Sequence, residues 1–145
     1  MTFQQSIKTC LFYKYFFVFK GRASRSEFWW FMLFIGLCNV VSVLVFGRLP
    51  YRIGGSLSLI VSLLLLPANL GVTVRRFHDR NLKGWWLLLP IGMLLLWLAG
   101  GESSSQGVSL VNTAMCLGYL LVLVLPGQPG ANRFGPVPGG EVRKN

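Results

Sequence analysis

The fold is decided by the stretch from Arg75 to Trp86, RRFHDRNLKGWW, which separates two long apolar runs. It contains four of the 14 Lys and Arg residues, one of the four carboxylates and the single histidine of the chain. A short basic turn between long apolar runs is typical of a membrane protein whose helices cross the bilayer and return. We therefore expect this turn to fix the direction in which the chain is threaded.

The composition indicates a membrane protein rather than a soluble domain. Of the 145 residues, 53% are hydrophobic and 12% are charged, whereas a soluble domain carries about 25% charged residues. The apolar residues fall into four blocks with the charges between them, which predicts an all-α membrane protein with four transmembrane helices. The expected spans cover residues 28–46, 54–74, 85–99 and 108–125.

Two further segments flank the four-span domain, which is predicted to cover residues 24–125. Residues 1–23 are predicted to be an amphipathic interfacial segment. Because residues 2–19 combine many aromatic rings with lysines, they are expected to form an N-terminal interfacial helix that lies on the membrane. Ser24 and Glu27 form the capping-box pattern at the start of the first span. Residues 126–145 are rich in Gly and Pro and are expected to lack regular structure, apart from residues 132–136.

The distribution of Lys and Arg predicts the orientation of the chain. Twelve of the 14 lie in the N-terminal segment, the central turn and the tail, and none lies in the polar loop 100–107. The other two, Arg48 and Arg52, lie between the first two spans. Because cytoplasmic loops carry an excess of Lys and Arg, both termini are predicted to be cytoplasmic.

Three polar runs are therefore expected to meet on the cytoplasmic side. They cover residues 21–27, 75–84 and 132–136. The corresponding sequence runs are GRASRSEFW at residues 21–29, RRFHD with GWW at 75–79 and 84–86, and GANRFGP at 130–136. These runs resemble the signature of the small bacterial inner-membrane proteins called Domain of Unknown Function 805, and the resemblance covers nearly the whole chain. It implies a four-span inner-membrane protein and no activity. The family usually has glycine near Asn81 and a small polar residue near Lys83, but asparagine tolerates the left-handed conformation, so we expect the turn to be kept.

The charged residues of this face form a candidate network that is either structural or binds anionic lipid head groups. Cations clustered at the cytoplasmic interface attract anionic lipid by roughly 1 kcal/mol each, and the same cations set the topology. Asp79 is expected to pair with an arginine, and Glu27 with an arginine of the central turn as well as with the helix start. The candidate residues are Arg22, Arg25, Glu27, Arg75, Arg76, His78, Asp79, Arg80, Lys83 and Arg133.

The pair of His78 and Asp79 is the feature that most suggests catalysis, because a carboxylate can orient an imidazole for proton transfer. However, adjacent residues on a helix point about 100° apart, so the two side chains are poorly placed to bond each other. We favour a structural role in which His78 caps the last turn of the second span. The main alternative is a membrane enzyme that acts on lipid phosphate groups through Arg75, Arg76 and His78.

Two asparagines inside the spans raise a second alternative, a small transporter or oligomeric pore. Asn39 and Asn112 are predicted to lie at a similar depth and to contact each other. Two such residues are more often an interhelical contact than a substrate site.

Other site classes find no support in the sequence. It contains no P-loop, HExxH, GxSxG or metal-ligand spacing, so no catalytic residue, cofactor or metal is predicted. The basic residues flank apolar spans instead of forming one soluble face, which favours membrane lipids over nucleic acid as partners. A membrane-protein partner or a second copy of the chain is a further candidate. The predicted function is a non-enzymatic accessory or scaffold component of the inner membrane.

Overall fold

The computed structural model describes residues 1–11, 18–92, 95 and 106–138, and for residues 106–109 and 112 only the backbone. The elements are α1 (Phe3–Leu11), α2 (Arg25–Phe46), α3 (Tyr51–Asp79), the 3₁₀ helix η1 (Gly84–Leu87) and α5 (Gln106–Val124). Besides these helices, the described residues contain one isolated β-bridge, between Asn132 and Gly135. The predicted all-helical fold is therefore confirmed.

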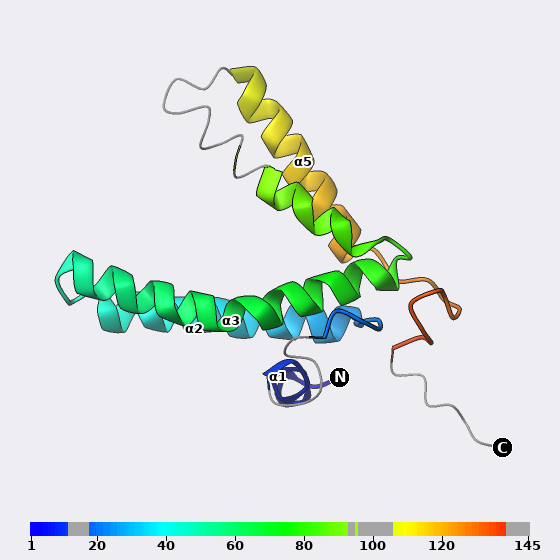
Figure 1. The fold of residues 1–145 in the computed structure, drawn as a ribbon, viewed down its shortest axis with the longest axis horizontal. Coiled ribbons are helices and arrows are strands. Elements are labelled where there is room, and N and C mark those ends of the chain that lie inside the picture. Colours follow the sequence, from blue (N-terminus) through cyan, green and yellow to red (C-terminus); the bar gives the residue numbers. More distant parts are fainter. Residues whose placement is uncertain (12–17, 93–94, 96–105, 139–145) are drawn as a thin grey trace.

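The first two long helices form a tight antiparallel hairpin (Figure 1). Helix α2 begins as predicted at an Ser24 cap, whose hydroxyl oxygen accepts a hydrogen bond from the Glu27 amide at 3.1 Å. A short turn leads from Gly47 to Pro50, and α3 starts at once. A Cβ atom at Gly54 would overlap the carbonyl oxygen of Phe46. Glycine at this position therefore allows the first turn of α3 to pack closely against the end of α2.

Helix α3 extends further than the predicted span 54–74, because the residues from Arg75 to Asp79 continue it. These charged side chains are all buried, and the helix stays regular because each finds a partner nearby. The helix ends at Asp79, and Asn81 in the following turn has a φ of 60°. The expectation that Asn81 adopts the left-handed conformation is confirmed, and with it the turn that returns the chain.

The second half of the chain leaves this hairpin at an angle. The predicted span 85–99 begins with η1 and continues as an α-helix at residues 88–92, while its remainder lies largely outside the described residues. Helix α5 runs beside this segment, and both diverge from the α2–α3 hairpin, meeting it near the end of α3 (Figure 1). The described helices are thus arranged as two diverging pairs rather than as one parallel bundle.

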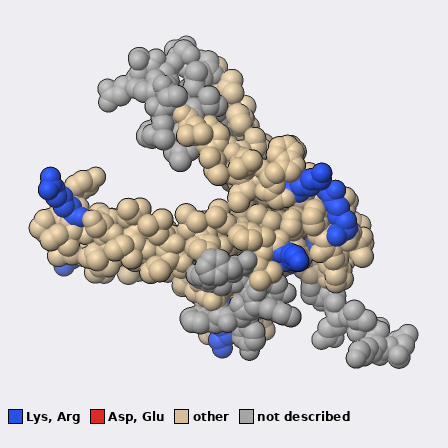
Figure 2. All heavy atoms as spheres, viewed as in Figure 1, with Lys and Arg blue, Asp and Glu red and all other residues tan. Residues whose placement is uncertain are grey.

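The surface of the long helices is that of a membrane protein. Helices α2 and α3 are long and apolar enough to cross a bilayer, yet only 17% and 28% of their most apolar windows are buried inside the molecule. A core helix of a soluble protein would hide these side chains, whereas lipid can cover them. In Figure 2 the cations appear at the two ends of the hairpin and beside α1, and the surface between them is formed by uncharged residues. We conclude that the chain is a helical membrane protein.

Helix α1 runs across the hairpin, since Figure 1 looks along its axis while α2 and α3 lie across the view. Its buried side chains are Ser6 and Cys10, which are four residues apart and so share one face. The phenyl ring of Phe3 packs edge-on against Trp30 of α2, with ring centroids 5.8 Å apart. Residues 3–11 of the N-terminal segment are therefore helical and docked on the start of α2.

Candidate functional site

Three segments that are far apart in the sequence meet at the end of α3. The backbone amide of Ala23, just before α2, donates to the carbonyl of Arg75 at 3.0 Å. The amide of Gln128, in the tail after α5, donates to the carbonyl of Asp79 at 2.9 Å. The three polar runs expected to lie on one side of the membrane are thus in direct contact.

The carboxylate of Asp79 lies between two arginines. Its Oδ1 atom accepts from Nε of Arg22 at 2.9 Å, and Nη2 of the same guanidinium lies 2.8 Å away. Its Oδ2 atom accepts from Nη1 of Arg76 at 2.5 Å. Asp79 therefore joins the segment before α2 to the end of α3.

A second buried ion pair lies beside the first. Nη1 of Arg75 donates to Oε1 of Glu27 at 2.5 Å, so the Glu27 carboxylate binds an arginine of α3 instead of reaching back to the helix cap. Two side chains of helix α1 contact the residues of this ion pair. The hydroxyl of Ser6 donates to the carbonyl of Glu27 at 2.6 Å, and the Cys10 sulfur lies 3.6 Å from Nη2 of Arg75.

Backbone carbonyls bind further guanidinium donors of Arg76 and Arg22. Arg76 donates from Nε and Nη2 to the carbonyl of Leu123 at 3.1 and 3.0 Å, and from Nη2 also to that of Leu125. Arg22 donates to the carbonyls of Gln128 and Gly130 at 2.7 and 2.6 Å. The last carbonyls of a helix have no partner within it, so Arg76 caps α5 from a neighbouring helix.

The His78 side chain contacts residues outside α3. Its Nδ1 atom lies 3.1 Å from the Gly21 carbonyl, so this nitrogen carries the proton and donates it. The imidazole stacks on the Phe134 ring with centroids 3.8 Å apart and planes 4° from parallel. The prediction that His78 caps the last turn of α3 is therefore wrong, because its ring turns towards Gly21 and the tail.

The ten predicted residues divide into groups with different surroundings. We call Arg22, Glu27, Arg75, Arg76 and Asp79 the buried charge cluster, since their exposed fractions are 0 to 8%. Three guanidinium groups face two carboxylates there, which leaves a net charge of +1. We call Arg25, Arg80, Lys83 and Arg133 the exposed rim, although Arg80 is half-buried and donates to the Pro126 carbonyl at 2.6 Å. His78 is buried as well, with an exposed fraction of 8%.

The exposed rim is also tied to the tail. Nη2 of Arg133 donates to the Asn81 carbonyl at 2.7 Å, and its guanidinium lies 4.7 Å from the centre of the Phe134 ring. Lys83 is exposed at the turn. Arg80 and Arg133 are therefore held by backbone carbonyls near the end of α3, while Arg133 and Lys83 remain exposed.

Asn39 and Asn112 were predicted to contact each other. The Asn39 side chain donates to the Ile35 carbonyl at 2.9 Å and accepts from the Ser62 hydroxyl of α3 at 3.4 Å. The side chain of Asn112 lies outside the described residues, so its contact with Asn39 stays a prediction.

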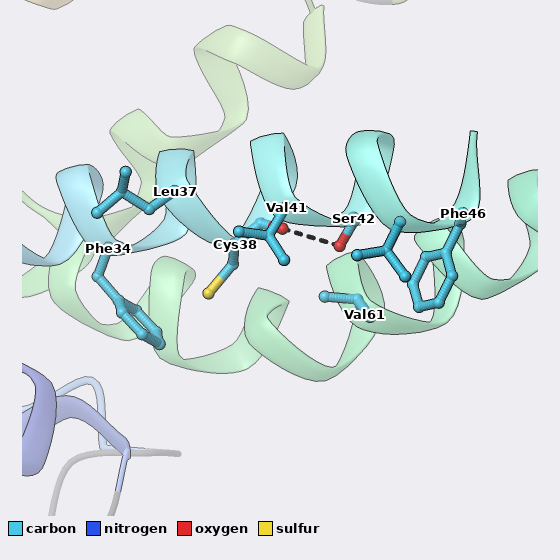
Figure 3. Close-up of a pocket in the computed structure, with 8 residues that line it drawn as sticks. Phe34, Leu37, Cys38, Val41, Ser42, Phe46 and Val61 are labelled. Atoms are coloured by element: carbon cyan, nitrogen blue, oxygen red, sulfur yellow. Dashed lines mark hydrogen bonds between the residues drawn. The ribbon is translucent and has the colours of Figure 1, made fainter. Parts of the chain in front are cut away.

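Two apolar cavities lie along the helices. The first has a volume of about 540 Å³ between α2 and α3, where Phe34, Cys38 and Val61 line it beside the Ser42 hydroxyl, which donates to the Cys38 carbonyl (Figure 3). The second has a volume of about 430 Å³ and lies between the α2–α3 hairpin and the pair formed by α5 and residues 87–90. Within the described residues, no group of three or more His, Cys, Asp or Glu side chains is arranged to hold a metal ion.

Sequence reasoning missed Ser6, Cys10 and the carbonyl groups of residues 123–130. Ser6 and Cys10 looked like ordinary members of an amphipathic helix, although their spacing does place them on one face. The carbonyl partners carry no sequence signal, because every residue has a carbonyl group. The one available signal is the glycine content of the tail, because glycine lets the backbone approach side chains closely.

These features define a class: a helical membrane protein whose segments are joined at one end by a buried cluster of arginines and carboxylates. The chain belongs to the family described as Protein of unknown function (DUF805), whose model matches residues 16–136. The inner membrane protein YhaH of Escherichia coli is 30% identical over 130 residues, covering 83% of this chain and 86% of YhaH. The inner membrane protein YhaI of the same organism is 29% identical over 124 residues, covering 83% and 85%. No solved structure matches the chain significantly.

Proposed function

We propose that this protein is a non-enzymatic accessory or scaffold component of the inner membrane, with four spans, both termini cytoplasmic and an exposed rim that contacts anionic lipids. The observation that carries the proposal is the division of the charges into two groups. Glu27 and Asp79 are the only side-chain carboxylates among the described residues, and both are used inside the buried charge cluster. The rim cations are left without acidic partners in that part of the chain, which favours an external anion.

The surroundings of Arg75, Arg76 and His78 argue against catalysis on lipid phosphates. The two guanidinium groups are 1% and 0% exposed and are held by protein groups. The imidazole donates to a backbone carbonyl and one of its faces is covered by Phe134. A catalytic histidine needs a reachable nitrogen and a second reacting group. These contacts support a structural role for all three residues.

The proposed orientation follows from the contacts and from the charges. The start of α2, the end of α3 and the tail touch one another, so they lie on the same side of the membrane. Most Lys and Arg residues of the chain belong to these segments, and such segments stay on the cytoplasmic side. Helix α1, which runs across the hairpin, then lies along the cytoplasmic surface.

Lipid-dependent thermal stability tests this function. The purified protein, stripped of native lipid in mild detergent, is melted with added phosphatidylglycerol or with phosphatidylcholine. We expect phosphatidylglycerol to raise the melting temperature more, because it binds the folded rim and not the unfolded chain. Replacing both Lys83 and Arg133 with Gln should reduce this difference.

The matched control replaces Arg48 and Arg52, the two cations at the opposite end of the hairpin, with Gln. This pair changes the net charge equally, so it should leave the difference between the two lipids unchanged. An equal response to both lipids, or an equal loss in the control variant, would overturn the proposed contact with anionic lipids.

A further inference from the structure

The second cavity lies where the two diverging helix pairs meet. Its walls are Phe28, Trp29 and Met32 of α2 on one side and Tyr119, Leu120 and Leu123 of α5 on the other. Its volume of about 430 Å³ falls within the roughly 300–1,000 Å³ of ordinary ligand pockets. The lining is almost wholly apolar, so a hydrocarbon chain is the ligand that it fits.

The end of this cavity nearest the buried charge cluster is positively charged. Leu123 lines the cavity, and its carbonyl oxygen accepts from Arg76. Arg25 precedes Phe28 and Trp29 by three and four residues, so it lies on the same face of α2, one turn nearer the helix start. It is exposed and close enough to Arg76 for the two charges to interact.

Neither carboxylate in the described part of the chain is left over to balance the charge of Arg25. The buried charge cluster already has a net charge of +1, because both carboxylates there are shared among three guanidinium groups. Arg25 adds a further cation at its edge. A buried excess charge is costly unless a counter-ion approaches it, so an anionic group beside Arg25 would be bound there.

A polar group also lies within the cavity. Asn69 lines it, and its side-chain amide has no hydrogen-bond partner among the described residues. Its backbone carbonyl accepts from the Thr73 hydroxyl at 2.7 Å. Asn69 lies seven residues before Arg76, about 10 Å along the helix axis. The ester carbonyl of a lipid whose phosphate lies at the charged end could accept a hydrogen bond from its amide.

We propose that this cavity is a binding site for one anionic phospholipid, with an acyl chain between α2 and α5 and its phosphate at Arg25. This inference rests on the proposed function and makes it specific, since it assigns one retained lipid to one place. Acyl chains of any lipid can contact the apolar walls, so these walls determine the position of the bound lipid and not its type. The charge at Arg25 decides which lipid is retained.

Native mass spectrometry of the protein in detergent tests the site. Phosphatidylglycerol and phosphatidylcholine are supplied in equal amounts, and the lipid retained on each chain is counted. We expect the wild type to keep one phosphatidylglycerol. Arg25→Gln should lower its retention about fivefold, the change that about 1 kcal/mol corresponds to. Leu120→Trp, which fills the cavity, should lower it at least as much.

Leu121→Trp is the matched control, because Leu121 is the next residue of α5, is 58% exposed and does not line the cavity. It should retain phosphatidylglycerol as the wild type does. If Leu120→Trp elutes as aggregated protein, Leu120→Phe takes its place, and its retention is read in the same way.

The outcomes separate the two proposals. Retention that survives filling of the cavity but falls in the Lys83→Gln, Arg133→Gln double variant would overturn this site and leave the rim contact standing. Equal retention of both lipids by the wild type would overturn both. Loss of retention in the Leu120 variant alone, with Leu121→Trp unchanged, supports the assigned site.

Discussion

Arg22 and Asp79 lie 57 positions apart in the chain, yet Nε of Arg22 donates to Oδ1 of Asp79 at 2.9 Å with both side chains buried. Because Asp79 also binds Arg76, one carboxylate neutralises guanidinium groups from two elements. Its loss would leave two arginines close together without a counter-charge.

We therefore expect Asp79→Asn to destabilise the protein more than His78→Gln. Breaking a buried ion pair on one side costs about 3 kcal/mol or more. His78→Gln removes a ring stack and alters one hydrogen bond, each worth about 1 kcal/mol. Membrane abundance and melting temperature in detergent measure the order. A stable, abundant His78→Gln protein that fails to complement a phenotype would instead favour catalysis.

Gly127 is predicted to tolerate no side chain. A Cβ atom there would overlap the carboxylate of Asp79, whereas a Cβ at Gly130, three residues further along the same tail, meets no atom within 4 Å. Overpacking at a site of this kind costs about 1–3 kcal/mol. Gly127→Ala should thus lower the melting temperature clearly, while Gly130→Ala leaves it nearly unchanged. Equal melting temperatures for the two variants would mean that the tail does not pack on Asp79.

The Cys10 thiol is predicted to be unreactive in the folded protein. Burial, together with the nearby Glu27 carboxylate, raises its pKa from 9.0 to about 11. After Cys38 and Cys116 are replaced by Ala, iodoacetamide at pH 8 should modify Cys10 more than about 100-fold slower than a free thiol. Because the folded state holds this proton more tightly, its contribution to stability is present below pH 9.0 and is lost as the pH rises towards 11. Fast labelling at pH 8 without unfolding would show that α1 is not docked on Arg75.

Reporter fusions test the orientation of the chain. A fusion after Asn145 and an insertion in the turn at residues 81–83 should both report the cytoplasm. An insertion in the loop 100–107 should report the opposite side, because that loop contains no cation. A C-terminus on the outside would contradict the proposed four-span topology.

The sequence predicted the elements of this fold better than their ends. The Ser24 cap and the left-handed Asn81 follow from local chemistry, so both could be identified from single residues. The span 54–74 was placed from its uncharged residues, whereas the helix runs on through the charged residues to Asp79 because each of these finds a buried partner. Those partners come from α2 and the tail, and hydrophobic periodicity carries no information about such distant pairs.

The site was predicted as a set of residues but not as two groups. Charge counts identified all ten positions, yet they could not separate Arg76, which is fully buried, from the exposed Lys83. What decides the difference is that Arg76 reaches the carbonyls of Leu123 and Leu125. Backbone carbonyls are present at every position, so their choice depends on the folded path of the chain alone.

The capping of α5 by Arg76 has a consequence for the order of biosynthesis. The carbonyl of Leu123 is made 47 residues after Arg76, so this guanidinium cannot form the bond until the end of α5 has been synthesised. Assembly at this end of the membrane domain is therefore completed only after α5 has been made. We expect a chain truncated after residue 120 to be degraded much faster in a pulse-chase experiment than one truncated after residue 138. Equal half-lives would show that the maturing protein does not depend on this late capture.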